Sequence, residues 1–229
     1  MIRLLLLCLL SVPLQVFSAT ESAAVLWYVE KEKGLEAYKT RYIITQDYMR
    51  SDAGNDQDGF ILFDRKARII YNVVPDTETI LVLKGDKQPI DRPTTFDIKE
   101  SLTNASSDTP KIDGKSSREY RLQVDGKPCF SAMIVADFYT QSANAFQEFA
   151  RVLAAQQVRS LENTPADMIS SCFLARAVYA AGNYLSKGLP VLEWNEEGGS
   201  KQLLDYAIEN VAAELFKTPE NYQRYSPGE

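Results

Sequence analysis

Histidine, the side chain most often used as a general base and as a metal ligand, is absent from all 229 residues of this chain. Its absence excludes Ser-His-Asp and Cys-His catalysis and every histidine-ligated metal site. The chain also lacks a Gly-x-Ser-x-Gly elbow, a Walker loop and a dinucleotide-binding glycine fingerprint. Catalysis by carboxylate, Tyr or Lys side chains alone is compatible with the composition, but no pair of them stands out. We therefore expect a protein that is not an enzyme and that uses no cofactor.

The densest group of possible metal ligands is Asp52, Asp56 and Asp58. An EF-hand loop requires a carboxylate at its first position and a bidentate Glu at its last. Here Gly54 and Arg65 occupy those two positions. A solvated loop between strands explains the three aspartates better than a cation site does, so we predict no metal.

Cys129 and Cys172 are the cysteines outside the N-terminal segment. In an exported protein an even pair suggests a disulfide. The bond would close a loop of about 44 residues and stabilise the fold by at most roughly 4 kcal/mol. The alternative is two buried free thiols, because the sequence does not place their Cα atoms within about 7 Å of each other.

Residues 1–18 have the composition of a signal peptide. Arg3 precedes an apolar run from Leu4 to Leu10, and we expect cleavage after Ser18 or Ala19. An uncleaved anchor and a lipid on Cys8 fit the pattern less well. The apolar run is shorter than the ~20 residues that a membrane-spanning helix needs, and no later stretch is long enough. We therefore predict a periplasmic or secreted protein with no transmembrane span after cleavage.

The charge of the chain argues against nucleic acid as a partner. The net charge is −6, and loss of Arg3 would make it one unit more negative. No basic cluster interrupts this acidic composition, so nucleic acid and anionic membrane surfaces are poor candidates.

The central stretch Phe60 to Leu83 predicts three consecutive antiparallel strands. Its apolar runs are Phe60–Phe63, Ile69–Val74 and Ile80–Leu83, rich in β-branched and aromatic residues. The short loops between them demand antiparallel neighbours. The runs are continuous rather than alternating, so we expect both faces of the sheet to be covered.

Other segments extend this meander into a single domain over residues 19–229. An Asp125-Gly126 pair between two apolar runs predicts a hairpin. We expect strands between about residues 23 and 136, a helical pair at about 139–187, and a C-terminal strand pair and tail at 189–229. Further strands are expected at 23–30, 37–45, 48–50, 96–102, 117–124, 129–136 and 189–194.

The helical pair follows from spacing and from a capping signal. Phe146, Phe149, Ala150 and Leu153 fall on one face of a helix. Thr164, followed by Pro165, predicts the start of a second helix that runs to about Ser186. Residues 200–211 fit a helical face slightly better than a strand, and both remain open from the pattern alone.

Several segments together resemble the LolA/LolB-like superfamily of periplasmic lipoprotein carriers, in particular its uncharacterised branches. They are the exported N-terminus, Tyr48-Met49-Arg50, Phe60–Asp64 with Arg65, Ile69-Ile70-Tyr71, Thr79–Leu83, Gly188-Leu189-Pro190 and Phe216-x-x-Pro219-x-x-Tyr222. The resemblance implies an up-and-down antiparallel half-barrel around helices, with an apolar concavity, and it favours a strand at 200–210. The chain departs from the carriers in its long helical segment, and no carrier residue matches position by position. Lipoprotein transport is therefore not carried over.

The fold class that we predict is α+β, with an antiparallel, up-and-down, curved sheet packed against two or three helices from the C-terminal half. We expect an exported cell-envelope protein that binds a lipid or another apolar ligand between sheet and helices. Aromatic and aliphatic strand residues either fill the core or line such a cavity. The candidate lining residues are Trp27, Tyr42, Phe60, Leu62, Ile70 and Val82. The alternative is a structural or assembly partner of another envelope protein.

Overall fold

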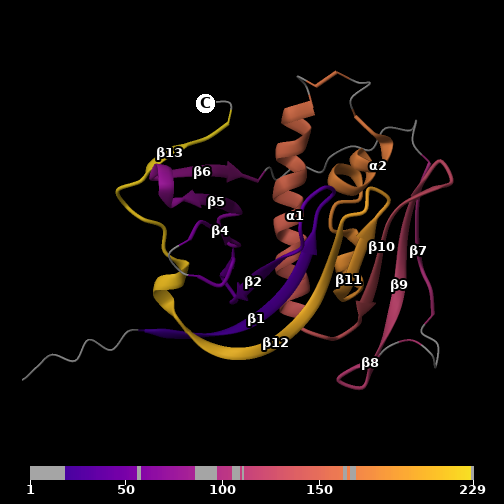
Figure 1. Ribbon diagram of the computed structural model, residues 1–229, viewed down its shortest axis with the longest axis horizontal. Coiled ribbons are helices and arrows are strands. Elements are labelled where there is room, and N and C mark those ends of the chain that lie inside the picture. Colours follow the sequence, from indigo (N-terminus) through magenta and orange to yellow (C-terminus); the bar gives the residue numbers. More distant parts are fainter. Residues whose placement is uncertain are drawn as a thin grey trace, which may run out of the picture.

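The computed structural model describes residues 19–55, 58–85, 97–104, 109, 111–161, 164–165 and 169–227. Within these residues thirteen strands form one open, curved sheet, and the long helix α1 (Thr140–Leu161) lies inside its curve (Figure 1). The fold is therefore α+β, as the sequence predicts. The predicted signal peptide, residues 1–18, lies outside the described residues.

The first part of the sheet is a meander in which each strand pairs with the next in antiparallel fashion. It contains β1 (Thr20–Lys31), β2 (Tyr38–Ile44), β3 (Tyr48–Asp52), β4 (Phe60–Asp64), β5 (Ile69–Val74) and β6 (Thr79–Lys84). Short loops leave no room for a parallel crossover, so local sequence decides this pairing. The three central strands lie where the apolar runs predict them.

The second part of the sheet is also antiparallel and returns to the first. It contains β7 (Ile98–Leu102), β8 (Lys111–Ile112), β9 (Lys115–Val124), β10 (Lys127–Val135), β11 (Leu189–Asn195) and β12 (Ser200–Ala212). The hairpin between β9 and β10 turns at Asp125 and Gly126, whose φ angles are 50° and 77°. Two positive φ angles are what a two-residue type I′ turn requires, which explains the Asp-Gly pair.

β12 joins the two parts, because it pairs with β1 along its whole length and with β11 near its start. Residues 200–211 are thus a strand, as the resemblance indicates. At the far edge, β13 (Gln223–Tyr225) runs parallel to β6.

Successive strand residues face opposite sides of the sheet, and in the meander β1–β6 both sides are covered. Tyr28, Ile44 and Phe63 belong to the core under α1. Their neighbours belong to a second core on the other side, which the C-terminal segment closes with Phe216 and Tyr222. The expectation that the central strands are covered on both faces is therefore confirmed.

The C-terminal segment is attached through a short 3₁₀ turn, η5 (Ala213–Phe216). The ring of Phe216 stacks on Tyr48 at 5.6 Å between centroids, and Arg50 Nη1 donates a hydrogen bond of 3.0 Å to the Leu215 carbonyl oxygen.

The predicted second helix is wrong in its start and in its continuity. Thr164 does not cap it, because its Oγ1 donates back to the carbonyl oxygen of Ser160 at 3.0 Å. The helix α2 (Ser171–Leu174) begins instead after Ser170, whose Oγ accepts a 3.0 Å hydrogen bond from the Phe173 amide. It widens into a π-helical turn, η3 (Ala175–Tyr179), and a separate 3₁₀ segment, η4 (Asn183–Lys187), follows.

Gly182 causes the break between these pieces. Its φ is 69°, and a Cβ there would lie 3.3 Å from the Gln147 Cα of α1. The chain therefore crosses α1 too closely for a continuous helix with side chains at this point.

Candidate functional site

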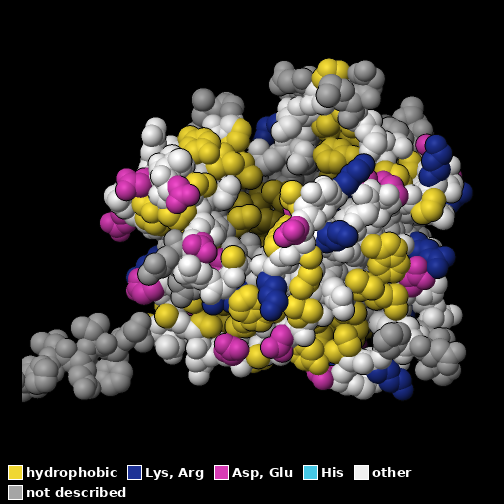
Figure 2. All heavy atoms as spheres, in the orientation of Figure 1, with side chains coloured by type: hydrophobic (Ala, Val, Ile, Leu, Met, Phe, Trp, Pro, Cys, Tyr) yellow, Lys and Arg dark blue, Asp and Glu magenta, His cyan; other side chains and the backbone are white. Residues whose placement is uncertain are grey.

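A recess of about 160 Å³ lies between the sheet and α1. Apolar and aromatic side chains make most of its wall, and two ionisable side chains complete it, a composition typical of small-molecule sites. The lining residues are Tyr42, Phe146, Phe149, Ala150, Leu153, Tyr184, Leu185, Pro190, Glu193 and Lys201. Figure 2 shows hydrophobic side chains gathered in a hollow near the middle of the face in view.

Lys201, on β12, lies at the wall of this recess, where its ammonium contacts Tyr42 and Glu30. Its Nζ donates a 2.8 Å hydrogen bond to Tyr42 Oη and lies 3.3 Å from Glu30 Oε1. The Tyr42 hydroxyl donates in turn to Glu30 at 2.7 Å. The three groups therefore form a connected polar network with little exposure to solvent, since the Lys201 and Glu30 side chains are each 20% exposed.

Three aromatic rings surround the same ammonium, and we call Tyr28, Tyr42 and Phe146 the aromatic cage. The distances from Lys201 Nζ to their ring centroids are 4.6, 4.0 and 5.0 Å. All three lie within the ~6 Å range in which a ring face attracts a cation. The rings meet edge to face, with centroids 5.0 to 6.2 Å apart, which fixes their orientation.

Glu193 stands opposite Lys201, because the two residues are paired in register between β11 and β12. Its Oε1 accepts a 2.8 Å hydrogen bond from the Tyr184 hydroxyl. Burial raises the pKa of Glu193, while the nearby Lys201 and the Tyr184 hydrogen bond partly oppose that rise. Burial also raises the pKa values of Tyr28, Tyr42 and Tyr184, so these phenols keep their protons.

A polar groove of about 450 Å³ adjoins the recess at the ends of β1, β11 and β12. Lys201 and Glu193 line both hollows and so mark where they meet. The groove carries four acidic and four basic side chains: Glu30, Glu32, Glu193, Glu197, Lys31, Lys33, Arg176 and Lys201. The site therefore combines an apolar end with a charged but balanced end, an arrangement suited to binding an amphipathic molecule.

The structure does not bring the six predicted ligand-binding residues together. Only Tyr42 lines the recess, and Ile70 lies on the same side of the sheet without reaching it. The other four pack in the core on the opposite side: Trp27, Phe60, Leu62 and Val82. All six residues are apolar or aromatic, and that character cannot separate neighbours that alternate between two covered faces.

Sequence reasoning missed Lys201, Glu193, Glu30 and Tyr184. A single Lys or Glu in a strand gives no signal of its own, and Glu30 reaches the other three only because β1 pairs with the distant β12. The helical spacing of Phe146, Phe149, Ala150 and Leu153 did contain a signal, because these four side chains form the α1 wall of the recess.

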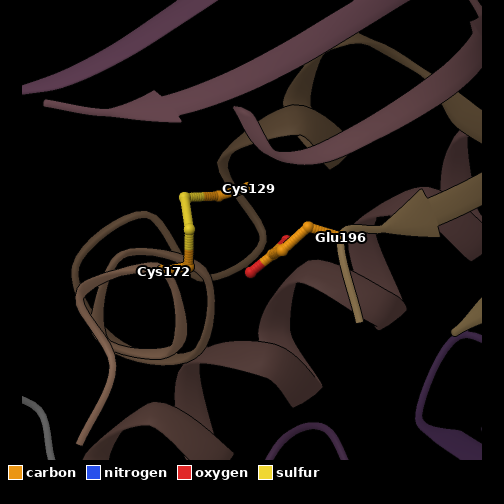
Figure 3. Close-up of side chains that lie close together, drawn as sticks. All are labelled: Cys129, Cys172 and Glu196. Carbon is orange, nitrogen blue, oxygen red and sulfur yellow. A yellow bond between two sulfur atoms is a disulfide. The ribbon is translucent and has the colours of Figure 1, made fainter. Parts of the chain in front are cut away.

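Cys129 of β10 and Cys172 of α2 form a disulfide with a Cα–Cα distance of 5.2 Å, so the predicted pairing is confirmed. In Figure 3 the Glu196 carboxylate points toward the bond. Among the described residues these three are the one group with potential ligand atoms within 4.8 Å of each other. Bonded sulfurs are not thiolates, so in this oxidised form the group offers a metal only the carboxylate.

Asp52 of the rejected calcium loop has another role. Asp52 accepts hydrogen bonds from Arg41 at 2.8 Å and Arg50 at 2.7 Å, and one from the Gly54 amide at 2.9 Å. Burial alone would raise the pKa of Asp52, but these donors outweigh it and hold the pKa below its ordinary value. Asp56 lies outside the described residues.

Within the described ranges, no helix is both long enough and apolar enough to cross a membrane.

No protein-family model matches the chain, and no curated protein matches its sequence. Among solved structures, two crystal structures of PNGF-II, in space groups C2 and P21, show a distant likeness with a TM-score of 0.40 each. The sequence identities are 11% and 10%, over 91% and 90% of this chain. The likeness covers 31% of each PNGF-II chain, so this chain spans less than a third of their length.

Proposed function

We propose that this protein is an exported, non-enzymatic binding module of the cell envelope that holds a small amphipathic molecule between its sheet and α1. The apolar end of the ligand enters the recess, and its polar end lies where the recess meets the groove. One observation carries the proposal: Lys201 and Glu193 line both hollows, so a single molecule can occupy the two together.

The size of the recess limits the ligand. An engineered apolar cavity of about 150 Å³ binds benzene, and this recess measures about 160 Å³. One ring or a short branched chain therefore fits, whereas the long acyl chain of a membrane lipid does not. The proposal narrows the expectation of a lipid or other apolar ligand to small amphiphiles.

The polar groups of the site favour binding over catalysis. Tyr42, Tyr184 and Lys201 each make a hydrogen bond or an ion pair inside the site, as do the carboxylates of Glu30 and Glu193. Export rests on the sequence of residues 1–18, and the Cys129–Cys172 disulfide is consistent with an oxidising compartment.

The second candidate function is that of an assembly partner for another envelope protein. The exposed apolar side chains of β12 favour it, because Leu204 is 48% and Ile208 is 65% exposed. Ile208 also borders a shallow hollow of about 380 Å³ with Tyr139 and Ala24. The test is a pull-down from envelope extract with the wild-type protein and with Ile208→Asp. We expect a partner that binds the wild type and not the variant. Without such a partner, this candidate has no support.

The binding proposal is tested by filling the recess. Ala150→Leu adds three carbon atoms at the α1 wall, and we expect it to weaken binding of p-cresol by about tenfold or more, since the lost volume excludes the ring. Asn144→Leu is the control, because it also introduces a leucine into α1 but at an exposed position away from the recess. Calorimetric titration measures both, and thermal unfolding shows whether each variant is folded.

Leu153→Phe fills the recess from the next turn of α1 and serves if Ala150→Leu does not fold. The proposal fails if p-cresol does not bind the wild type, or if it binds recess-filled and control variants equally well.

A further inference from the structure

We propose that the polar end selected by this site is an organic ammonium group, and that the Lys201 side chain occupies in this structure the position that the ligand's ammonium takes. The inference rests on the proposed function and names the class of ligand. The geometry that points to it is an aromatic cage with two carboxylates beside it, closed around a cation that the chain itself supplies.

The cage is built for a cation. The faces of aromatic rings carry negative electrostatic potential, and they attract an ammonium most strongly where water is excluded. Tyr28 is fully buried and Phe146 is 9% exposed, so two of the three rings are shielded from solvent. A cation placed within 5.0 Å of all three rings, as Lys201 Nζ is, gains from each of them.

The carboxylates beside the cage also favour a cationic ligand. Glu30 lies 3.3 Å from the ammonium, and Glu193 faces it from β11. A ligand carboxylate placed here would meet two protein carboxylates and three ring faces, which repel it. We therefore expect the site to rank ligands in the order cation, neutral molecule, anion.

Lys201 can leave the cage without breaking the fold. Its side chain already lines the groove, where Glu32 and Glu197 offer alternative partners. Its backbone is held by β1 and β11 on either side, so only the side chain needs to move. The incoming ammonium takes the place of the Lys201 ammonium against the three rings and beside Glu30, whose carboxylate also keeps the hydrogen bond from Tyr42. Lys201 thus competes with the ligand for the cage.

The test compares three ligands with the same ring: benzyltrimethylammonium, benzyl alcohol and phenylacetate. On wild-type protein we expect the cation to bind about tenfold tighter than the alcohol, which matches the ~1.4 kcal/mol that several cation–π contacts supply. Phenylacetate is expected to bind most weakly. Calorimetric titration gives the three dissociation constants.

Lys201→Ala removes the competitor, so it should tighten binding of the cation by a further factor of about ten. It should leave binding of benzyl alcohol nearly unchanged. The variant leaves Glu30 without its ion-pair partner and is expected to melt below wild type. The cation should raise its melting temperature more than that of wild type. Lys99→Ala is the control, since Lys99 forms only a surface ion pair with Asp97.

The outcomes separate this inference from the proposed function. If the alcohol and the cation bind equally and Lys201→Ala changes neither, the recess binds rings but the ammonium inference is wrong. Tightest binding of phenylacetate, lost in Lys201→Ala, would make Lys201 an anion anchor and overturn the inference in the same way. If none of the three ligands binds wild type or Lys201→Ala, both the proposed function and the ammonium inference fail.

Discussion

At the scale of single residues, the site is a chain of paired charges in a poorly hydrated place. Glu30, Lys201 and Glu193 face one another across three adjacent strands, β1, β12 and β11. Removing one partner of such a group leaves the others buried without compensation, which costs more than the interaction itself supplies. The energetic cost of holding these charges makes sense if a ligand uses them.

Glu193 gives the site a measurable dependence on pH. Its pKa is raised above the ordinary value of 4.5 chiefly by burial. The folded protein therefore holds a proton that the unfolded chain has released, and the free energy of unfolding falls as pH rises from 4.5 toward the raised pKa. Glu193→Gln cannot titrate, so we expect this decline to disappear from urea unfolding measured between about pH 4 and 7.

Glu209→Gln is the control, because Glu209 lies exposed on β12. Asp52 does not change the pH profile in this range. Because its pKa is lowered, its protonation reduces the free energy of unfolding only at pH values below its ordinary pKa of 3.8. Identical pH profiles for wild type and Glu193→Gln would show that the carboxyl of Glu193 is not buried in the way described.

Single residues were also where sequence reasoning was least successful. Tyr42 is aromatic and lies in a strand, which predicts a place in the site. Trp27 and Phe60 have the same two properties, but they face the opposite side of the sheet. The face of each residue depends on the register of its strand, and a shift of one position reverses it. Where both faces are apolar, composition cannot fix that register.

At the scale of elements, the sequence predicts strands and turns correctly where their signals are strong and short-range. The three central strands and the Asp125-Gly126 hairpin needed only apolar runs and turn residues. β12 was harder, because Leu204, Ala207, Ile208 and Val211 fit a helical face slightly better than a strand. Its strand form is decided by pairing with β1, which lies at the opposite end of the described chain.

Gly188 shows how one position joins two elements, since it connects η4 to β11. Its φ is 138°, and a Cβ there would lie 2.7 Å from the Val135 carbonyl carbon and 2.9 Å from the Ala136 Cα. Backbone atoms cannot yield as a flexible side chain does. We expect Gly188→Ala to reduce the free energy of unfolding by about 3 kcal/mol or more, as backbone strain and overpacking combine.

The matched control is Gly126→Ala at the β9–β10 turn. Gly126 also has a positive φ, 77°, but nothing lies within 4 Å of its added Cβ. Only the conformational cost of about 1 kcal/mol should remain there. Urea unfolding of both variants measures the difference, and equal losses would mean that β10 can move away from Gly188.

At the scale of the whole molecule, the sheet is covered by different parts of the chain on its two faces. α1 covers the concave face, and the segment after β12 returns along the other face to place β13 beside β6 (Figure 1). The sequence predicted that both faces of the central strands are covered and that helices cover one of them, but it did not predict what covers the other. The tail carries few apolar residues, and the parallel contact of β13 with β6 joins positions far apart in the sequence.

Phe216 is the main anchor of that covering segment. It is 6% exposed and stacks on Tyr48, while its neighbour Leu215 accepts the hydrogen bond from Arg50. We expect Phe216→Ala to lower the free energy of unfolding by about 3–5 kcal/mol, the usual loss for a buried Phe. The segment should then detach and expose Leu62, Val73 and Val82, which an apolar fluorescent dye would report.

Tyr225→Ala provides the comparison, because Tyr225 belongs to the same segment but is 49% exposed. Its loss should cost less than about 1 kcal/mol and should bind no additional dye. p-Cresol binding should survive in both folded variants, since the recess lies on the other face of the sheet. If Phe216→Ala instead abolished p-cresol binding while the protein stayed folded, the two faces would be coupled, and the ligand site would extend through the sheet to its tail.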